Sequence, residues 1–456
     1  MDPRPDTIIE LVDDVARRAS AYLGSIDERS VAPTPEALIA LDRFHEPLPA
    51  GPSDPAATLA LLDEVGSPAT MATTGPRYYG FVNGATLPAA LAAAWMVSTW
   101  DQNAALPVMS PVAERLHTVV RGWLNQLLGF AETTQVSFVT GATMANASAL
   151  AAARDHQLAR AGWDVQSQGL FGAPELTVVV GEKAHSTVYK SLGLVGLGRD
   201  RVVVVPGDDQ GRMVASEIPD LDGPVVICAQ AGEVNTGAFD PFPEIVAWAR
   251  QRDGWVHVDG AFGLWALADP SRQHLVEGLT DADSWATDGH KWLNVTYDCG
   301  LVFVRRTEDL RRTFAAAAGY LPPADGYEAM HHTPQSSQRP RQIEVWAALR
   351  SLGRSGVAEL VAAACDRAQA LAAGMADLGL EVLNTVVLNQ VLVRAADEET
   401  TNALMAAIQA DGTCWCGPTV WAGHTAMRVS VSGWKTTQGD VERSLEAIGR
   451  CWEAVL

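Results

Sequence analysis

Two short stretches of the chain carry residues whose types and spacing could do chemistry. The first, Trp255-Val-His257-Val-Asp259-Gly-Ala261, has the pattern of a short buried β-strand that ends in a carboxylate. The second, Ser284-Trp-Ala-Thr-Asp288-Gly-His290-Lys291-Trp292, places a lysine beside a tryptophan and a leucine. An ammonium group is unusual in apolar company unless chemistry requires it there. Together the two stretches predict a cofactor site.

Pyridoxal phosphate chemistry needs both of these groups. A lysine amine forms a Schiff base with the cofactor aldehyde, and a carboxylate keeps the pyridine nitrogen protonated so that the ring accepts electrons from a substrate carbanion. Taken alone, Asp259 also fits a helix N-cap or a turn residue. Lys291 alone fits a surface lysine whose stem packs on apolar neighbours. The pair favours the cofactor.

Both stretches also carry a family resemblance. His257-Val-Asp259-Gly-Ala261 and Asp288-Gly-His290-Lys291-Trp292, followed by Asp298-Cys299-Gly300, resemble signature segments of the group II pyridoxal-phosphate-dependent amino acid decarboxylases. This family includes the aromatic amino acid and glutamate decarboxylases, and further matches run from about Gly75 to Asp440. The resemblance implies an α/β, aspartate aminotransferase-like fold (fold-type I), pyridoxal 5'-phosphate as cofactor, and a homodimer.

A phosphate-binding turn is expected after the first strand of the large domain. Val136 to Thr140 is a β-branched and aromatic run, followed by Gly141-Ala142-Thr143 and a helical segment. The free N–H groups and the positive dipole end at a helix start suit a phosphate, although strand, glycine and helix is also how α/β folds turn. The resemblance favours a phosphate cup at Ala142 and Thr143, with His290 helping to hold the phosphate.

The resemblance also assigns residues to the cofactor ring. Lys291 would carry the cofactor and Asp259 would hold the pyridine nitrogen, with Ala261 against the ring. His185, in an Ala-His-Ser element, would stack on the ring and contact the substrate carboxylate or carry protons; a helix cap or surface histidine is the alternative. Two further contacts at the cofactor edge are expected from Asn235 and Thr236, although Glu233 and Val234 depart from the hydroxyl residues common there.

A long polar segment from Leu321 to Arg341 shows little periodicity and several prolines. A segment of this length without secondary structure is a functional loop or disorder. The resemblance implies a loop that closes over the active site and brings a tyrosine, which protonates the carbanion. Tyr327 matches that tyrosine only with a gap, so His332 is kept as its rival.

Substrate-pocket residues are expected in two aromatic segments. Pro76-Arg77-Tyr78-Tyr79-Gly80-Phe81 resembles a segment of the family, and the region of Trp100 lies where the family places substrate-pocket residues. Tyr79, Phe81 and Trp100 therefore hint at an apolar or aromatic substrate. An aromatic core cluster with a helix end at Asp101 is an equal alternative. Arg428 either binds a substrate carboxylate or is a solvated residue on an edge strand.

The elements that must position these residues alternate along the chain. Strands are expected at 136–140, 176–180, 202–205, 225–229, 255–259 and 300–305, with helices between them. This predicts a mainly parallel sheet with helices on both faces and active residues at the carboxyl ends of the strands. The domains expected are an N-terminal helical segment (1–74), a large cofactor-binding domain (75–341) and a small C-terminal α/β domain (342–456). The small domain would have strands at 391–394 and 427–431 and helices at 400–410 and 439–455.

Composition restricts the class of protein. The 456 residues are 48% hydrophobic with a net charge of −21, which argues against nucleic acid or an anionic membrane as a partner. Six scattered cysteines predict reduced thiols in a cytoplasmic enzyme. The N-terminus lacks signal-peptide features, no metal site is expected, and the apolar stretch from Leu87 to Val97 is too short for a membrane span and predicts a buried helix.

The function predicted is decarboxylation of an L-amino acid through a Lys291 Schiff base, as a carboxy-lyase of amino acid metabolism. The alternatives on the same cofactor are an aldolase or other carbon–carbon lyase, an aldehyde synthase and an aminotransferase, because all begin with the same substrate adduct. Outside this class, His257, Asp259 and His290 could serve a metal-dependent hydrolase, or the chain could be a binding protein without catalysis.

Overall fold

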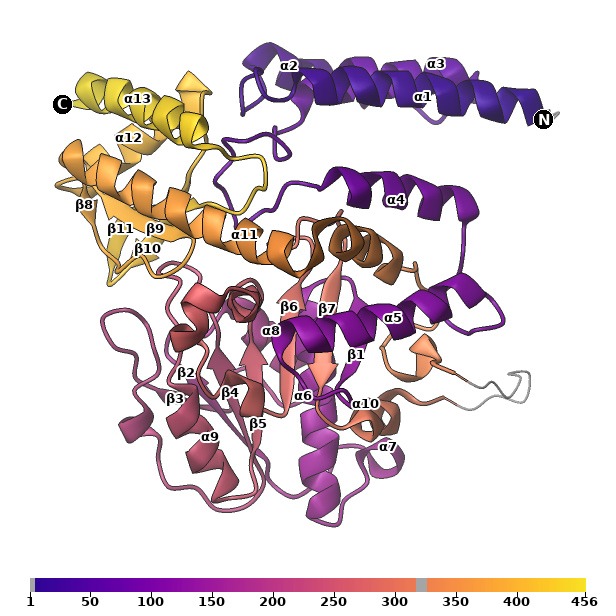
Figure 1. The fold of residues 1–456 in the computed structure, drawn as a ribbon, viewed down its shortest axis with the longest axis vertical. Helices are drawn as coiled ribbons and strands as arrows, with labels where there is room; N and C mark the ends of the chain where they lie inside the picture. Colours follow the sequence, from indigo (N-terminus) through magenta and orange to yellow (C-terminus); the bar gives the residue numbers. More distant parts are fainter. Residues whose placement is uncertain (1–4, 317–325) are drawn as a thin grey trace.

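A seven-stranded sheet forms the centre of the computed structural model, which describes residues 5–316 and 326–456 (Figure 1). Its order is β1-β7-β6-β5-β4-β2-β3. The bounds are β1 Gln135–Val139, β2 Thr177–Gly181, β3 Val202–Val205, β4 Val225–Gln230, β5 Trp255–Asp259, β6 Ser284–Asp288 and β7 Gly300–Val304. Only β7 runs against its two neighbours among these strands. The mainly parallel sheet that the sequence predicts is therefore confirmed.

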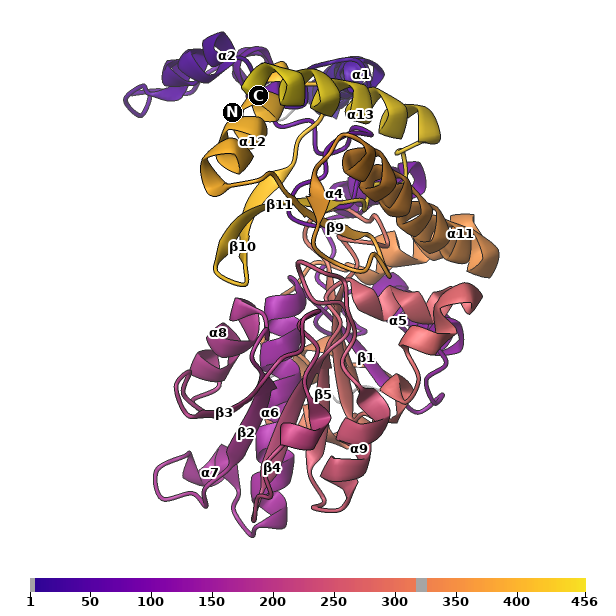
Figure 2. The ribbon, with the colours of Figure 1, turned by 90° about the vertical axis from the view of Figure 1, so that its left-hand side faces the viewer.

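Helices cover both faces of this sheet, so its inner strands are apolar on both sides. Figure 2 shows α6 (Ala142–Arg160), α7 (Val165–Gln168) and α8 (Ser186–Leu194) on one face. The helices α5 (Pro111–Leu128) and α9 (Phe242–Arg250) lie on the other. Helix α10 (Thr307–Phe314) packs on α6. The carboxyl ends of β5 and β6 thus open at one edge of a covered sheet.

The small domain is built on a four-stranded antiparallel sheet with the order β10-β11-β9-β8. Its strands are β8 Glu381–Val382, β9 Gln390–Arg394, β10 Gly417–Trp421 and β11 His424–Ser430, with α11 (Gln342–Asp377), α12 (Glu398–Asp411) and α13 (Gln438–Val455). The sequence reasoning missed β8, which is two residues long, and β10. The second miss has a physical cause, because β10 begins Gly-Pro, and proline is tolerated in a sheet only at an edge such as this one.

The N-terminal helices are α1 Pro5–Ser25, α2 Pro35–Ala40 and α3 Pro55–Leu61, followed by α4 Pro88–Trp100. Figure 1 shows α1, α2 and α3 beyond α4, away from the large sheet. The expectation of a buried helix at 87–97 holds for one face of α4 only. Ala90 and Val97 are buried, whereas Trp95 and Met96 are 40% and 51% exposed. In residues 5–316 and 326–456, no helix combines the length and apolar character that crossing a membrane requires.

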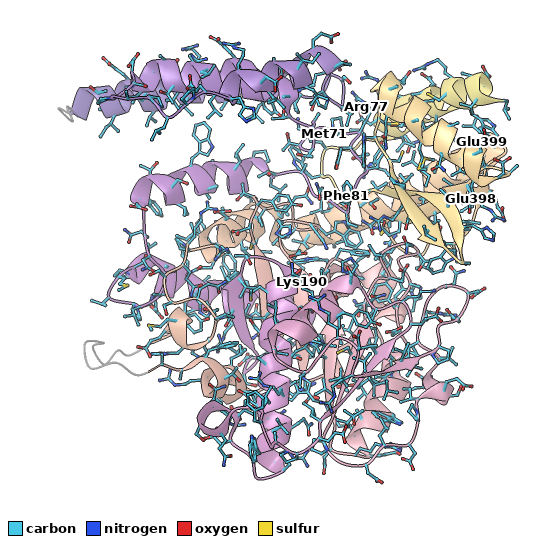
Figure 3. All side chains as sticks on the ribbon, turned by 180° about the vertical axis from the view of Figure 1, so that it is seen from behind. Met71, Arg77, Phe81, Lys190, Glu398 and Glu399 are labelled. Carbon is cyan, nitrogen blue, oxygen red and sulfur yellow. The ribbon has the colours of Figure 1, made fainter. Side chains whose placement is uncertain are left out.

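Residues 76–84, which we call the strap, connect the N-terminal helices to the small domain and the site. Arg77 is 3% exposed and donates hydrogen bonds to the carbonyl of Thr413, the carboxylate of Asp440 and the carbonyl of Asp27. Figure 3 shows Arg77 and Phe81 along this segment, beside the small domain. Farther along the strap, a Cβ at Gly84 would lie 1.8 Å from the carbonyl oxygen of Lys291. The strap is therefore anchored at one end and pressed against the lysine at the other.

Candidate active site

A cavity of about 210 Å³ lies where β5 and β6 end and α6 begins. Parallel strands present their carboxyl ends at one sheet edge, and ligands of open α/β sheets bind there. The structure brings together at this cavity seven of the residues that the sequence suggests for the cofactor: Ala142, Thr143, His185, Asp259, Ala261, His290 and Lys291.

One end of the cavity is suited to an anion. The backbone N–H of Ala142, in the first turn of α6, donates to Asp288 Oδ1 at 2.6 Å. His290 Nε2 lies 3.4 Å from the same oxygen. A helix N-terminus with an imidazole beside it can hold a phosphate group.

Lys291 follows β6 in a turn that the core fixes. Trp292 and Leu293 are 1% and 0% exposed, so they bury the turn and leave the amine of Lys291 at the cavity. The amine lies 3.2 Å from Asp288 Oδ2. This arrangement explains the lysine beside a tryptophan in the sequence, because the apolar residues hold the turn and the carboxylate holds the ammonium group.

Asp259 lies at the end of β5 and is 5% exposed. Asn146 Nδ2 donates to its Oδ2 at 3.0 Å and the N–H of Ala261 donates to its Oδ1 at 3.1 Å. Burial raises the pKa of the Asp259 carboxyl, while the neighbouring His185 and Lys291 side chains and these hydrogen bonds work against the rise. A buried carboxylate that lines a cavity in this way is suited to a cationic N–H partner, which a protonated pyridine ring would supply.

His185 is a helix cap, the alternative that the sequence allowed, and it also lines the cavity. It is the N-cap of α8, where Nδ1 lies 2.7 Å from Thr187 Oγ1 and accepts the N–H of Thr187. Burial lowers the pKa of the imidazole, so the ring is neutral near pH 7. The cap fixes the ring orientation, and stacking on a cofactor stays a prediction.

Asn235 and Thr236 do not line the cavity, in contrast to the sequence expectation. Asn235 Nδ2 donates to Glu233 Oε1 at 3.0 Å, and the N–H of Thr236 donates to Glu233 Oε2 at 2.7 Å. Glu233 is 2% exposed, and its carboxylate accepts the hydrogen bonds of the polar groups in this turn. Gly232 and Val234 line the cavity instead.

The three expected substrate residues lie apart from the cavity wall of this chain. Tyr79 is 1% exposed, with its hydroxyl 3.0 Å from Ser444 Oγ, so it belongs to the core. Trp100 ends α4 and is 40% exposed. Phe81 is 60% exposed on the strap and stacks on Trp415 with ring centroids 5.5 Å apart. Tyr79 and Phe81 both lie on the strap, which touches Lys291 at Gly84, but of the two only Phe81 is exposed.

Tyr327 and His332 pack at the edge of the large sheet instead of at the cavity. The hydroxyl of Tyr327 lies 2.8 Å from Ser137 Oγ on β1, and its ring stacks on His117 at 3.4 Å. His332 lies beside Tyr327, with ring centroids 4.7 Å apart. Of the expected loop, residues 321–325 lie outside the described residues, and the remainder contains a short 3-10 helix, Ala329–His331.

Two residues near the cavity received little or no weight from the sequence. Tyr297 stacks on His290 at 4.2 Å and donates to Asn83 Oδ1 at 2.8 Å, and burial raises its pKa to about 12. Arg428 is half-buried on β11, which is an inner strand, and donates to the carbonyl of Val234 at 3.3 Å. The solvated edge position considered for Arg428 is therefore wrong. Tyr297 lies six residues after Lys291, and this short separation along the chain was the signal that could have placed it near the cavity.

The metal-hydrolase alternative has no structural support. Across 5–316 and 326–456, no group of three or more histidine, cysteine or acidic residues is arranged to hold a metal ion. The two ring nitrogens of His257 lie 2.9 Å from Ser284 Oγ and 2.9 Å from Asn146 Oδ1. Hydrogen bonds thus occupy both positions at which this histidine could bind a metal.

Comparison with known proteins places this geometry in context. The model of the pyridoxal-dependent decarboxylase conserved domain matches residues 67–395. The L-2,4-diaminobutyrate decarboxylase of Rhizobium meliloti (strain 1021) is 28% identical, over 96% of this chain and 89% of its own length. The aromatic-L-amino-acid decarboxylase of Bacillus atrophaeus is 24% identical, over 73% of this chain and 70% of its own.

A solved structure shows the same fold. The crystal structure of Oryza sativa TDC with PLP and tryptamine matches 100% of this chain and 99% of that chain, with a TM-score of 0.91 at 20% sequence identity. The predicted fold-type I architecture, with a large mainly parallel sheet and a small second domain, is confirmed.

Proposed function

The chain belongs to the pyridoxal-dependent decarboxylase family, and we propose that it removes the carboxyl group of an L-amino acid with Lys291 as the residue that bonds to pyridoxal phosphate. One observation carries this assignment of roles. An amine, a buried carboxylate, an imidazole and a helix N-terminus converge on one cavity from four separate segments of the chain.

The residues present fit the cofactor at each of its ends. Ala142, Thr143 and His290 would hold the phosphate, and Asp259 would bind the ring nitrogen, with Ala261 and His185 against the ring. Bound pyridoxal phosphate supplies an electron sink for the negative charge that remains when the carboxyl group leaves.

The protein side chains bind, orient and hold protons around that group. Asp288 holds the Lys291 amine in place at 3.2 Å. Asp259 keeps a proton on the ring nitrogen because an ionised carboxylate stabilises a cationic N–H beside it. Because His185 Nδ1 accepts the Thr187 N–H, its neutral ring carries a proton on Nε2, and it can lie flat and donate from that atom. The guanidinium group of Arg428 would attract the substrate carboxylate from the small-domain side.

We propose an apolar or aromatic side chain for the substrate. The two relatives named above act, by their names, on side chains of different chemistry, so they do not indicate one substrate class. Among the described residues that line the cavity, the carboxylates Asp259 and Asp288 already bind protein donors. Phe81, on the strap that touches Lys291 at Gly84, and Tyr297, which stacks on His290, are both more than half exposed and present aromatic surface. That surface favours an apolar or aromatic group.

A product assay tests the function. Purified protein with added pyridoxal phosphate is given a panel of L-amino acids that includes 3-hydroxy ones, and mass spectrometry scores amine, aldehyde, keto acid and glycine. Amine with released carbon dioxide is the expected result. Because neither Tyr327 nor His332 lines the cavity, the other products are informative: glycine with an aldehyde indicates a carbon–carbon lyase, an aldehyde alone an aldehyde synthase, and a keto acid an aminotransferase.

Lys291→Ala tests the cofactor lysine independently. Borohydride reduction of the wild-type protein should fix the cofactor to the peptide that contains Lys291, and the variant should give no lysine adduct. The exposed Lys190→Ala variant, which changes a lysine away from the cavity lining, is the matched control and should keep the adduct. A trapped adduct at another lysine in the Lys291 variant would overturn the assignment.

We further propose a cytoplasmic homodimer in which the N-terminal segment 1–74 packs on the partner, beside a large domain (75–341) and a small domain (342–456). An apolar groove of about 940 Å³ between α1, α3 and α4 supports the dimer, since it leaves Trp95 and other apolar groups open to a partner. All six cysteines are buried free thiols, which suits a reducing compartment. Light scattering in solution that gives a monomer mass would refute the dimer.

A further inference from the structure

A chain of buried hydrogen bonds runs from the core to Asp259. Trp255 Nε1 lies 2.9 Å from Ser284 Oγ, which lies 2.9 Å from His257 Nδ1. His257 Nε2 lies 2.9 Å from Asn146 Oδ1, and Asn146 Nδ2 lies 3.0 Å from Asp259 Oδ2. The first four residues are 0–1% exposed and Asp259 is 5% exposed. The chain therefore reaches the cavity without contact with solvent on its way.

The chemistry of the two ends fixes the direction of every bond. The indole N–H of Trp255 can only donate, so Ser284 Oγ accepts there and gives its own proton to His257 Nδ1. The neutral ring then carries its proton on Nε2 and donates it to the amide oxygen of Asn146. The amide N–H of Asn146 donates in turn to the carboxylate of Asp259, which can only accept. All donors thus point toward Asp259, and aligned hydrogen bonds strengthen one another.

The chain can act without carrying charge. Burial lowers the pKa of His257 to about 3, so its ring is neutral at working pH. The hydrogen bond from Asn146 lowers the pKa of Asp259, against the upward effect of burial. The amide also ties Oδ2 to the first turns of α6, while Ala261 ties Oδ1 to the backbone beyond β5.

We propose that Asn146 and His257 are positioning residues, which hold the Asp259 carboxylate ionised and oriented for the ring nitrogen of the cofactor. This inference rests on the proposed function, because it assumes that Asp259 faces that nitrogen. The simpler alternative is that two buried polar side chains merely satisfy one another in the core. The two readings differ in whether loss of the chain weakens binding of the ring nitrogen in particular.

The experiment compares two ligands on the apoprotein of the full chain. One is pyridoxal phosphate, and the other is its deaza analogue, in which a C–H replaces the ring nitrogen. Fluorescence titration gives both dissociation constants and hence a preference for nitrogen. The wild type should prefer pyridoxal phosphate. Asn146→Ala should reduce this preference by about tenfold or more, the size of a hydrogen bond to a charged group, and leave the analogue's affinity within about twofold.

Further variants separate positioning from folding. His257→Phe should reduce the preference in the same direction, and His257→Gln, whose amide can still donate to Asn146, should restore most of it. Asp259→Asn should abolish the preference. Val258→Ala is the matched control, since Val258 is a fully buried neighbour on β5 outside the hydrogen-bond chain. If His257→Phe does not fold, Asn146→Ala and His257→Gln decide the question.

Each result has a distinct meaning. A wild type that prefers pyridoxal phosphate, with variants that lose that preference alone, supports the positioning role. Variants that lose affinity for both ligands equally, or that keep the full preference, overturn it while the cofactor assignment stands. A wild type without any preference for the ring nitrogen overturns the role assigned to Asp259, and this inference with it.

Discussion

Replacing Arg77 should destabilise the protein far more than an ordinary surface ion pair would. Its guanidinium group is 3% exposed and donates to Asp440 Oδ1 at 2.7 Å, to the Thr413 carbonyl at 2.9 Å and to the Asp27 carbonyl at 2.6 Å. Removing one partner of a buried ion pair leaves the other charge uncompensated, at about 3–5 kcal/mol. Asp440 keeps two donors from Thr437 in the capping box of α13. We therefore expect Arg77→Met to lower the unfolding free energy by about 3 kcal/mol, near the lower end of that range.

Urea unfolding of the two variants Arg77→Met and Arg443→Met checks this value. Arg443 also bridges to the N-terminal segment, at Glu28, but the two side chains are 48% and 78% exposed. Such exposed pairs contribute about 0–1 kcal/mol, so this variant is the matched control. Equal, small losses in both variants would refute the reasoning. They would mean that the strap does not depend on its buried anchor.

Two further predictions concern the site and the sheet edge. Gly84→Ala should push the strap away from the Lys291 carbonyl, destabilise the fold by about 1–3 kcal/mol through overpacking, and lower the yield of the borohydride-trapped adduct. Gly51→Ala is the control, because Gly51 has open space around it, and it should leave the yield unchanged. An unchanged yield in Gly84→Ala would contradict the close contact. Burial lowers the pKa of His117 from 6.5 to about 3. Between these two pH values the imidazole is therefore protonated in the unfolded chain and neutral in the folded protein. The unfolding free energy should therefore decrease as the pH is lowered from about 6.5 to about 3, by about 1.4 kcal/mol per pH unit for this group. His117→Asn should make the unfolding free energy from urea titrations depend less steeply on pH. An unchanged slope would show that the ring is charged in the folded protein.

The order of elements in the large domain could be predicted because its inner strands are buried on both faces. Strands β3 and β5 have the predicted bounds, since Val202 to Val205 is an unbroken run of valines and Trp255 to Asp259 carries three large apolar residues and ends before a glycine. The exposed face of α4 could not be predicted. An alanine-rich helix with tryptophans looks apolar on all sides, and only the spatial arrangement shows which tryptophans lack a cover.

Seven residues that line the cavity were suggested by local stretches and a family resemblance, and the expected residues that lie elsewhere were diverted by contacts with their neighbours. Asn235 and Thr236 have the right types for a polar contact, but Glu233 binds them first. Tyr79 alternates with Phe81 on the strap, and only the small domain decides which of the two is buried. Which of these two side chains is buried depends on residues hundreds of positions away, such as Ser444, and a single sequence does not show that such residues are in contact.

Asn146 illustrates what the fold adds to the pattern. In the sequence it is one polar residue on an alanine-rich helix, 113 positions from Asp259. In the structure it lies four residues after Ala142, so about one helical turn separates the backbone N–H of Ala142 from the Asn146 side chain that binds Asp259. Helix α6 therefore contributes to both ends of the cavity. Any change that shifts this helix along its axis should disturb the Ala142 end and the Asp259 end of the cavity together, because one rigid element sets the separation between them.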